Sequence, residues 1–404
     1  MKNILIFTVT LTMVLACKEA PKQPSQMEAK TYEKGSFAYD ETFLKKQDAG
    51  LIVLQQDSSK VIVSAKYQAK VFTSTVDGNE GKTLGWVNYD AFGKQNAHMN
   101  AYGGENRFWL GPEGNVFSLY FKPKAEMTFE NWKTPAPIDT EPWTVNSSNN
   151  ISVTLEKQMQ LKNYADSDFN IKAVREISIL DKSNIERLLK INLKDTKVVA
   201  YQTKNSIENI GDTAWTETTG APCIWMLDMF PPSEETTIVI PYNTKTEGNV
   251  ATTDYFGQIP EDRVTLNEGV LYFKADGKSR GKLGINPVRA TNVAGSYDAI
   301  NSILTITLFD VDPEATYLNQ EWKLEGDPLI GDAINAYNDG PLEDGSQMGP
   351  FYEIESVSPA AFLKPGETLT HDHAVFHFIG KAEALNAISE SVLGVSLEKI
   401  NNAL

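Results

Sequence analysis

Short segments rich in β-branched and aromatic residues recur along most of this chain, and they constrain its fold more than any other feature. The segments that predict strands are 51–55, 61–65, 70–75, 116–121, 151–155, 171–180, 188–193, 206–209, 236–241, 270–274, 283–285, 303–309, 351–355 and 374–379. Turn signals separate them at Asp77-Gly78, Gly211-Asp212, Asp276-Gly277 and Pro365-Gly366. Many short strands with almost no long helical period indicate an all-β fold of large antiparallel sheets packed face to face, with few short helices.

Two segments predict short helices at the two ends of this β-rich region. Asp40–Lys46 begins with an acid of the type that caps helices. Lys381–Leu393 carries Leu385, Ile388 and Val392 at helical spacing, so it predicts a short helical cap at the C-terminal end. No break in composition divides the chain between them, and we expect residues 36–404 to form a single domain.

The N-terminus has the features of a lipoprotein signal. Its apolar run, Ile4–Leu15, is too short to span a bilayer, so residues 1–16 read as a signal peptide. The ending Leu15-Ala16-Cys17 resembles a bacterial lipobox, in which Cys17 is lipidated; the alternative is an ordinary secreted protein with an incidental cysteine. Residues 17–35 are polar and predict a flexible tether. The expected location is the bacterial cell envelope, with the membrane bound through the lipid on Cys17.

Charge and cysteine content exclude two classes of protein. The chain has 37 Lys+Arg against 53 Asp+Glu, which gives a formal net charge of −16. An acidic surface of this kind repels phosphate backbones, so we expect no nucleic-acid partner. Of the two cysteines, Cys17 is the predicted lipidation site, which leaves Cys223 without a partner and excludes a disulfide framework.

A glycine-rich window, His98–Phe117, contains the first candidate ligand site. Gly103-Gly104 and Gly111-Pro112 bend the backbone on either side of a short polar stretch. The residues of this stretch that offer polar groups or a flat ring are Glu105, Asn106, Arg107 and Trp109. A carboxylate, an amide, a guanidinium and an indole together suit a polyol with one apolar face. The alternative is a corner between two strands in which Arg107 pairs with a structural acid.

The predicted strand at 351–355 carries two carboxylates on one face. Side chains alternate along a strand, so Phe351, Glu353 and Glu355 share a face. That face is either a solvated edge or an inward-facing functional pair. Burial beside apolar side chains would raise the pKa of such a carboxyl toward the working range of a general base.

Three histidines follow this strand closely. Their spacing places His371, His373 and His377 on one strand face, and an HxH pair on a strand is a metal-ligand geometry. His371 and His373 are therefore candidate metal ligands; the alternative is a polar strand face whose imidazoles meet backbone or acidic partners. No other cofactor is indicated, because the chain lacks a Walker loop, a GxSxG elbow, a CxxC pair and an HExxH motif.

Three further tryptophans, Trp215, Trp225 and Trp322, lie in contexts that resemble loops. Each is either an exposed ring that stacks on a sugar or a buried anchor.

Several segments, taken in order, resemble the galactose mutarotase-like superfamily, whose members are β-supersandwiches that include aldose epimerases and relatives binding carbohydrates. KYQAKVFTSTVDG (66–78) resembles the early strand and turn of that fold, and GGENRFWLGPEG (103–114) resembles a segment of uncharacterised relatives. SIENIGDTAW (206–215) resembles the mid-domain strand and turn. YEIESVSPAAFLKPGETLTHDHAVFHF (352–378) resembles the last strands of an epimerase. The resemblance covers most of residues 36–380.

The resemblance implies roles for individual residues. Glu353 falls where the family keeps its base, and Arg107 falls in the segment that supplies a sugar-contacting guanidinium. Epimerases place a catalytic histidine shortly after the mid-domain turn, but residues 220–230 contain none. His98 or Asp228 would have to replace this acid, and loss of a general acid typically costs about 10²- to 10⁴-fold in rate.

The sequence thus predicts an envelope lipoprotein that binds a saccharide, acidic or oligomeric, in a mutarotase-like cleft. The residues expected to bind it are Arg107, Glu105, Asn106, Trp109, Trp225 and Asp228, and those expected to be catalytic are Glu353 and His98. As an enzyme the protein would be an epimerase, a lyase or a hydrolase. The alternatives are a carbohydrate-binding module without turnover and a structural envelope protein.

Overall fold

The computed structural model describes residues 31–404. The predicted signal peptide, Cys17 and most of the predicted tether lie outside these residues. Within 31–404, no helix combines the length and the apolar character needed to cross a membrane.

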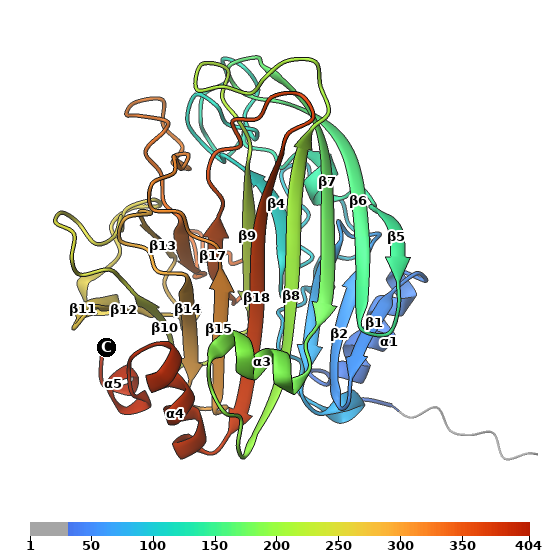
Figure 1. Ribbon diagram of the computed structural model, residues 1–404, viewed down its shortest axis with the longest axis vertical. Coiled ribbons are helices and arrows are strands. Elements are labelled where there is room, and N and C mark those ends of the chain that lie inside the picture. The colour runs from blue at the N-terminus through green and yellow to red at the C-terminus, as the bar shows by residue number, and fades with distance from the viewer. Residues whose placement is uncertain (1–30) are drawn as a thin grey trace, which may run out of the picture.

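The strands of residues 31–404 form three sheets, and every pairing within them is antiparallel. The largest sheet has ten strands, in the order β11 (Val264–Asn267), β12 (Val270–Lys274), β10 (Thr236–Pro241), β14 (Val293–Asp298), β15 (Ile303–Phe309), β18 (Thr368–Gly380), β8 (Thr196–Asn209), β7 (Asp168–Ile179), β6 (Ser152–Lys162) and β5 (Thr144–Ser148). In Figure 1 its longest strands, β8 and β18, run side by side along the long axis of the molecule. The predicted all-β class is confirmed.

Two smaller sheets form a second layer against the large one. A five-stranded sheet has the order β13 (Gly281–Ile285), β16 (Ile334–Asn338), β17 (Tyr352–Val357), β9 (Cys223–Phe230) and β4 (Arg107–Gly111). A three-stranded sheet has the order β1 (Ile52–Gln56), β2 (Ser59–Ser64) and β3 (Lys70–Thr75). A bridge between Val71 and Asn106, with a 3.1 Å hydrogen bond in each direction, joins the two sheets next to β4.

Alternating burial explains why the two layers stack. Along β7 nearly every second side chain is buried and the others are half-buried, which is the pattern of a strand with one face in the core. Strands of the five-stranded sheet are buried along their whole length instead, because both of its faces are covered. This second kind of strand carries the site described below.

Short helices complete the fold: α1 (Phe37–Gln47), α2 (Ala136–Asp139), α3 (Lys182–Leu189), α4 (Ala382–Val392) and α5 (Leu397–Asn401), with 3₁₀ turns η1 (Gly78–Glu80), η2 (Tyr89–Ala91) and η3 (Glu261–Arg263). Apolar side chains of α3, α4 and α5 pack on the outer face of the ten-stranded sheet. The predicted C-terminal helix is confirmed as α4, which lies with α5 at one end of the large sheet (Figure 1).

The predicted N-terminal helix exists as α1, but the expected cap is wrong. Ser36 is the cap residue, and its side chain accepts a hydrogen bond from the backbone N–H of Tyr39. Asp40 lies inside the helix and is fully buried, where it accepts hydrogen bonds from Thr83 and Tyr89. Burial raises the pKa of Asp40, and the two hydroxyl donors oppose that rise.

Two predicted strands are not strands. Residues 116–121 form a turn-rich loop whose apolar side chains are nonetheless mostly buried. Leu188 and Leu189 end α3, and the residues up to Leu193 follow it without strand pairing. Three strands of the five-stranded sheet that carry the site, β4, β9 and β16, were not predicted from the sequence.

Candidate functional site

One face of the five-stranded sheet gathers the side chains of a pocket. The register pairs Arg107 with Leu227 across β4 and β9, and Met229 with Glu353 across β9 and β17. Tyr337 on β16 continues this second row, since it pairs with Glu353 and with Lys282 of β13. Paired residues in an antiparallel sheet point to the same side, so these rows project outward together, away from the ten-stranded sheet.

The pocket above these rows has a volume of about 260 Å³. Aromatic rings dominate its walls: Trp109, Phe129, Trp132, Trp225, Phe256, Trp322, Tyr337 and Phe351. Its charged side chains are Arg107, Glu113, Arg280, Lys282 and Glu353. A mainly aromatic cavity with a few convergent polar groups is the usual form of a small-molecule site.

Two ion pairs cross the floor of the pocket, and each one reaches across an intervening strand of the sheet. Arg107 Nη2 donates to Glu353 Oε1, and both side chains are less than one-tenth exposed. Lys282 Nζ donates to Glu355 Oε2 at 3.0 Å, and the same carboxylate oxygen accepts a 2.8 Å bond from the indole N–H of Trp225. The two segments singled out in the sequence, around Arg107 and around Glu353, therefore meet in one cavity.

Cations also lie against the aromatic walls. The Arg107 guanidinium lies 4.9 Å from the centre of the Trp109 ring, and Lys282 Nζ lies 4.6 Å from that of Trp225. Contacts of this kind hold both the cation and the ring in place. The pocket is therefore a preorganised set of fixed charges and flat surfaces.

Two carboxyls in the pocket have raised pKa values. Burial raises the pKa of Glu353 to about 8, although Arg107 opposes part of the rise. Burial likewise raises the pKa of Glu113 to about 7, with Lys282 opposing it. Each group can therefore gain or lose a proton near neutral pH, which is the property that proton transfer requires.

These two raised values predict how stability depends on pH. A carboxyl whose pKa is higher in the folded state than the ordinary 4.5 binds its proton more tightly when the protein is folded. Its stabilising contribution to the free energy of unfolding is therefore fully present below about pH 4.5. That contribution is lost as the pH rises through about 7 for Glu113 and about 8 for Glu353. For each group we expect the free energy of unfolding to fall by up to about 1.4 kcal/mol per pH unit.

The measurement is chemical denaturation from pH 5 to pH 9 of the native protein and of the double variant Glu113→Gln and Glu353→Gln. The variant should show a flatter pH profile, because glutamine does not titrate in this range. Equal profiles for the two proteins would show that neither carboxyl has a raised pKa.

His98 lies at the rim of the pocket with its orientation fixed. Its Nδ1 lies 2.7 Å from the carbonyl oxygen of Trp132, so Nδ1 carries the proton in the neutral ring and Nε2 keeps a lone pair. The imidazole stacks on Phe129 at 4.7 Å between ring centres, and Trp132 stacks on Trp322 at 5.7 Å. Phe129 is 60 % exposed, so a large apolar ring faces solvent at the entrance.

The structure separates the predicted site residues into two groups. Arg107, Trp109, Trp225, Glu353 and His98 all line the pocket. The solvated-edge alternative for the strand at 351–355 is wrong, because Glu353 and Glu355 are both buried.

The expectation that Trp225 lies in a loop-like context is also wrong, since it lies on β9. Trp215 is a buried anchor packed edge-on against Phe169, whereas Trp322 lies in a loop and reaches the pocket.

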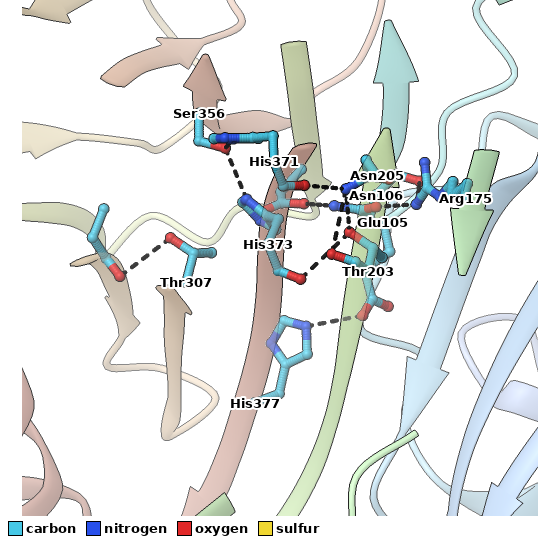
Figure 2. Close-up of polar contacts among 12 residues, drawn as sticks. Glu105, Asn106, Arg175, Thr203, Asn205, Thr307, Ser356, His371, His373 and His377 are labelled. Atoms are coloured by element: carbon cyan, nitrogen blue, oxygen red, sulfur yellow. Dashed lines mark hydrogen bonds and ion pairs between the residues drawn. The ribbon is translucent and has the colours of Figure 1, made fainter. Parts of the chain in front are cut away.

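The other three predicted binding residues, Glu105, Asn106 and Asp228, do not line the pocket. Asn106 directly precedes Arg107 and Asp228 directly follows Leu227, so both side chains point to the opposite side of the sheet, into the space between the layers. Glu105 precedes β4 and reaches the same space through its contacts with Ser74 and His377. Glu105 and Asn106 belong there to a buried polar network (Figure 2), and Asp228 joins it through Asn106 and His373. Asn106 Nδ2 donates to Asp228 Oδ1 at 2.6 Å, and Glu105 accepts bonds from Ser74 at 2.7 Å and from His377 Nε2 at 3.1 Å.

The buried network runs from the large sheet to the small one through a chain of side-chain contacts (Figure 2). Arg175 on β7 donates to the Asn106 carbonyl oxygen Oδ1, and Asn106 donates to Asp228 on β9. Asp228 Oδ2 lies 2.7 Å from His373 Nε2 on β18, and His373 Nδ1 lies 2.9 Å from Ser356 Oγ on β17. Burial lowers the pKa of Arg175 to about 10, which still leaves it charged at neutral pH.

The predicted metal ligands belong to the same network. Ser356 Oγ lies between His371 Nε2 at 2.8 Å and His373 Nδ1 at 2.9 Å, so it donates to one ring and accepts from the other. Burial lowers the pKa of His371 to about 3, which makes the ring neutral. Within residues 31–404 no group of three or more His, Cys, Asp or Glu side chains is arranged to hold a metal ion. The imidazoles instead meet hydroxyl and acidic partners, as in the alternative stated for them.

Sequence reasoning missed several pocket residues, namely Glu113, Phe129, Trp132, Arg280 and Lys282. Glu113 lies inside the glycine-rich window, directly after Gly111-Pro112. Its carboxyl lies close enough to Lys282 to interact with it electrostatically. The others come from loops and from β13, where no local pattern distinguishes a pocket residue from a surface residue.

Comparisons with known proteins identify the family of this chain. A model of a family of unknown function, DUF6786, matches residues 35–404. No curated protein matches the sequence.

Among solved structures, a putative aldose 1-epimerase from Escherichia coli K12 is similar, with a TM-score of 0.48 and 13% identity over 81% of this chain and 98% of that one. A galactose mutarotase-like protein from Lactobacillus casei is similar with a TM-score of 0.47 and 10% identity over 81% of this chain and 100% of that one. A galactose mutarotase related enzyme from Lactobacillus acidophilus has a TM-score of 0.44 and 8% identity over 81% and 97%.

Proposed function

The chain belongs to the DUF6786 family of unknown function, and we propose that its pocket binds a carbohydrate and exchanges a proton with it through Glu353. The observation that carries the proposal is the combination in one cavity of stacked aromatic walls with a buried, titratable carboxyl held by a guanidinium. A sugar ring has an apolar C–H face and a rim of hydroxyls, so it needs both kinds of surface.

Different residues of the pocket supply these two kinds of surface. Phe129, Trp132 and Trp322 offer flat surfaces to the C–H face of a ring. Arg107 and Lys282 offer donors that would fix the ring oxygen or the hydroxyls. The aromatic walls also exclude water, which strengthens each polar contact with the bound sugar.

The chemistry that fits these groups is opening and reclosing of the sugar ring. Unprotonated Glu353 takes the proton of the anomeric hydroxyl, the bond between the anomeric carbon and the ring oxygen breaks, and the ring oxygen receives a proton. Reclosing on the other face returns both protons, so no oxidant or cofactor is consumed. Glu113, when protonated, is a pocket group that could supply the proton to the ring oxygen, and His98 could do so only as the imidazolium, because its neutral ring keeps a lone pair at Nε2.

A binding module without turnover is the second candidate. The observation that favours it is the ion pair itself, because Arg107 holds Glu353 and competes with a substrate proton for the carboxylate. The two candidates share the ligand class and differ only in whether the sugar is converted.

Saccharide binding is tested with a panel of monosaccharides and oligosaccharides by calorimetry and thermal unfolding. A ligand that binds only the native state adds about 2.7 kcal/mol of stability at a hundredfold excess over its dissociation constant. We expect Phe129→Ala to weaken binding about five- to tenfold, because it removes one stacking surface from the entrance.

The matched control for this variant is Ile300→Ala, which removes an equally exposed apolar side chain from the turn between β14 and β15. Its affinity should equal that of the native protein. If no member of the panel raises the melting temperature, the pocket is not a saccharide site.

A further inference from the structure

A second, larger cavity adjoins the pocket. It has a volume of about 740 Å³ and runs along the residues that follow η1 and the loop before β17. Four residues, Asn96, Met99, Ala101 and Met348, line both the pocket and this cavity. The two spaces therefore lie side by side along these four residues. We call the second cavity the groove.

The junction between the two spaces is built on the edge of the five-stranded sheet. The backbone N–H of Trp86 donates to the carbonyl oxygen of Met229 at 3.0 Å, and the backbone N–H of Gly104 donates to the carbonyl oxygen of Trp86 at 2.8 Å. Gly103 and Gly104 have φ values of +78° and +124°, and a Cβ on Gly103 would lie 2.3 Å from the Trp86 carbonyl oxygen. The paired glycines thus let the chain pass closely enough to fix Trp86 at this edge.

Aromatic rings continue from the pocket into the groove. Trp86 lines the groove and Phe351 lines the pocket, and their ring centres lie 4.7 Å apart with a tilt of 34°. Phe351 lies 5.7 Å from Tyr337, farther into the pocket. Trp86 is only half-buried, so part of its ring remains available to a ligand.

The groove beyond Trp86 is polar. Asn88, Tyr89, Asp90 and Lys94 line it, together with Asn100 and Gln347. Amides, short charged side chains and a phenol suit a chain of hydroxyls better than they suit an apolar ligand. The groove therefore continues the mixture of flat rings and hydrogen-bonding groups that characterises the pocket.

Resting on the proposed function, we propose that the ligand is an oligosaccharide whose terminal sugar occupies the pocket and whose following sugars lie in the groove across Trp86. At about 260 Å³ the pocket alone is smaller than the usual small-molecule site of about 300 to 1,000 Å³, so it suits a single sugar ring. The groove supplies the space and the surface for the sugars that follow.

The test is calorimetric titration of the native protein with oligomers of glucose, galactose and N-acetylglucosamine, each from one to four units long. For the oligomer series that binds, affinity should rise at least tenfold between one unit and three units, which corresponds to about 1.4 kcal/mol. Trp86→Ala should abolish this gain while it leaves affinity for the single sugar unchanged, and Trp86→Phe should restore part of it.

Phe129→Ala serves as the matched comparison, because it alters the pocket entrance and should weaken binding of every length. Melting temperatures of all variants show whether each one is folded. Equal affinity for all lengths, or an equal loss for all lengths in Trp86→Ala, would overturn the assignment of the groove but leave the pocket as a saccharide site. Absence of binding at every length would overturn the proposed function and the groove assignment with it.

Discussion

Glu353→Gln is expected to slow exchange between the anomers of a bound sugar by about 10²- to 10⁴-fold, with little change in affinity. Glutamine keeps an oxygen that can accept the hydrogen bond from Arg107, so the pocket floor stays in place. It cannot take a proton, so only the chemical step is lost. Exchange is followed by NMR or polarimetry, with affinity measured by calorimetry on the same samples.

The matched control for this effect is Glu390→Gln, an exposed carboxyl on α4 far along the chain from the pocket strands. This variant should catalyse exchange between the anomers at the native rate. If Glu353→Gln also retains the native rate, the carboxyl is not the proton acceptor. If the native protein binds sugar but does not accelerate exchange at all, it is a binding module.

Asp228→Ala is expected to lower the free energy of unfolding by about 3–5 kcal/mol. The side chain is fully buried and accepts from Asn106, and it also contacts His373 Nε2 at 2.7 Å. Its removal leaves these two partners without their bonds and leaves the buried charge of Arg175 without the nearby carboxylate that opposes its desolvation.

Denaturant titration and thermal unfolding measure this loss, and Asp254→Ala is the control. Asp254 is exposed in a loop, and its removal should change stability by less than about 0.5 kcal/mol. The loss of stability in Asp228→Asn should lie between the losses in Asp228→Ala and Asp254→Ala, because asparagine keeps the shape of the side chain and loses its charge. A loss below about 1 kcal/mol in Asp228→Ala would show that the network does not bind the layers together.

The strands that the sequence predicted correctly are those with a clear signal of their own. Residues 70–75, 236–241, 270–274 and 303–309 match β3, β10, β12 and β15 because turns bound short β-branched runs. β9 was missed because CIWMLDMF is buried on both faces and shows no alternation. Residues 188–193, LLKINL, predict a strand because a short run of mostly apolar residues fits either structure, but the first two of them end α3.

The site could be predicted in part for a related reason. Period-two alternation fixes which strand residues share a face, but it does not say which face meets the ligand. Arg107 therefore reached the pocket, whereas its neighbour Asn106 points between the layers. The same parity separates Leu227 from Asp228 on β9. Only the packing of one sheet on the other, which is a long-range property, decides the side.

The five-stranded sheet thus separates two sets of side chains, with the pocket on one surface and the buried polar network on the other. Under the proposed function, pocket positions such as Trp109 can be varied to change which ligand binds, while positions on the other surface such as Asp228 and Ser356 maintain the body of the molecule. A library of variants can therefore change the pocket side of these strands while it keeps the buried contacts that hold the two layers together.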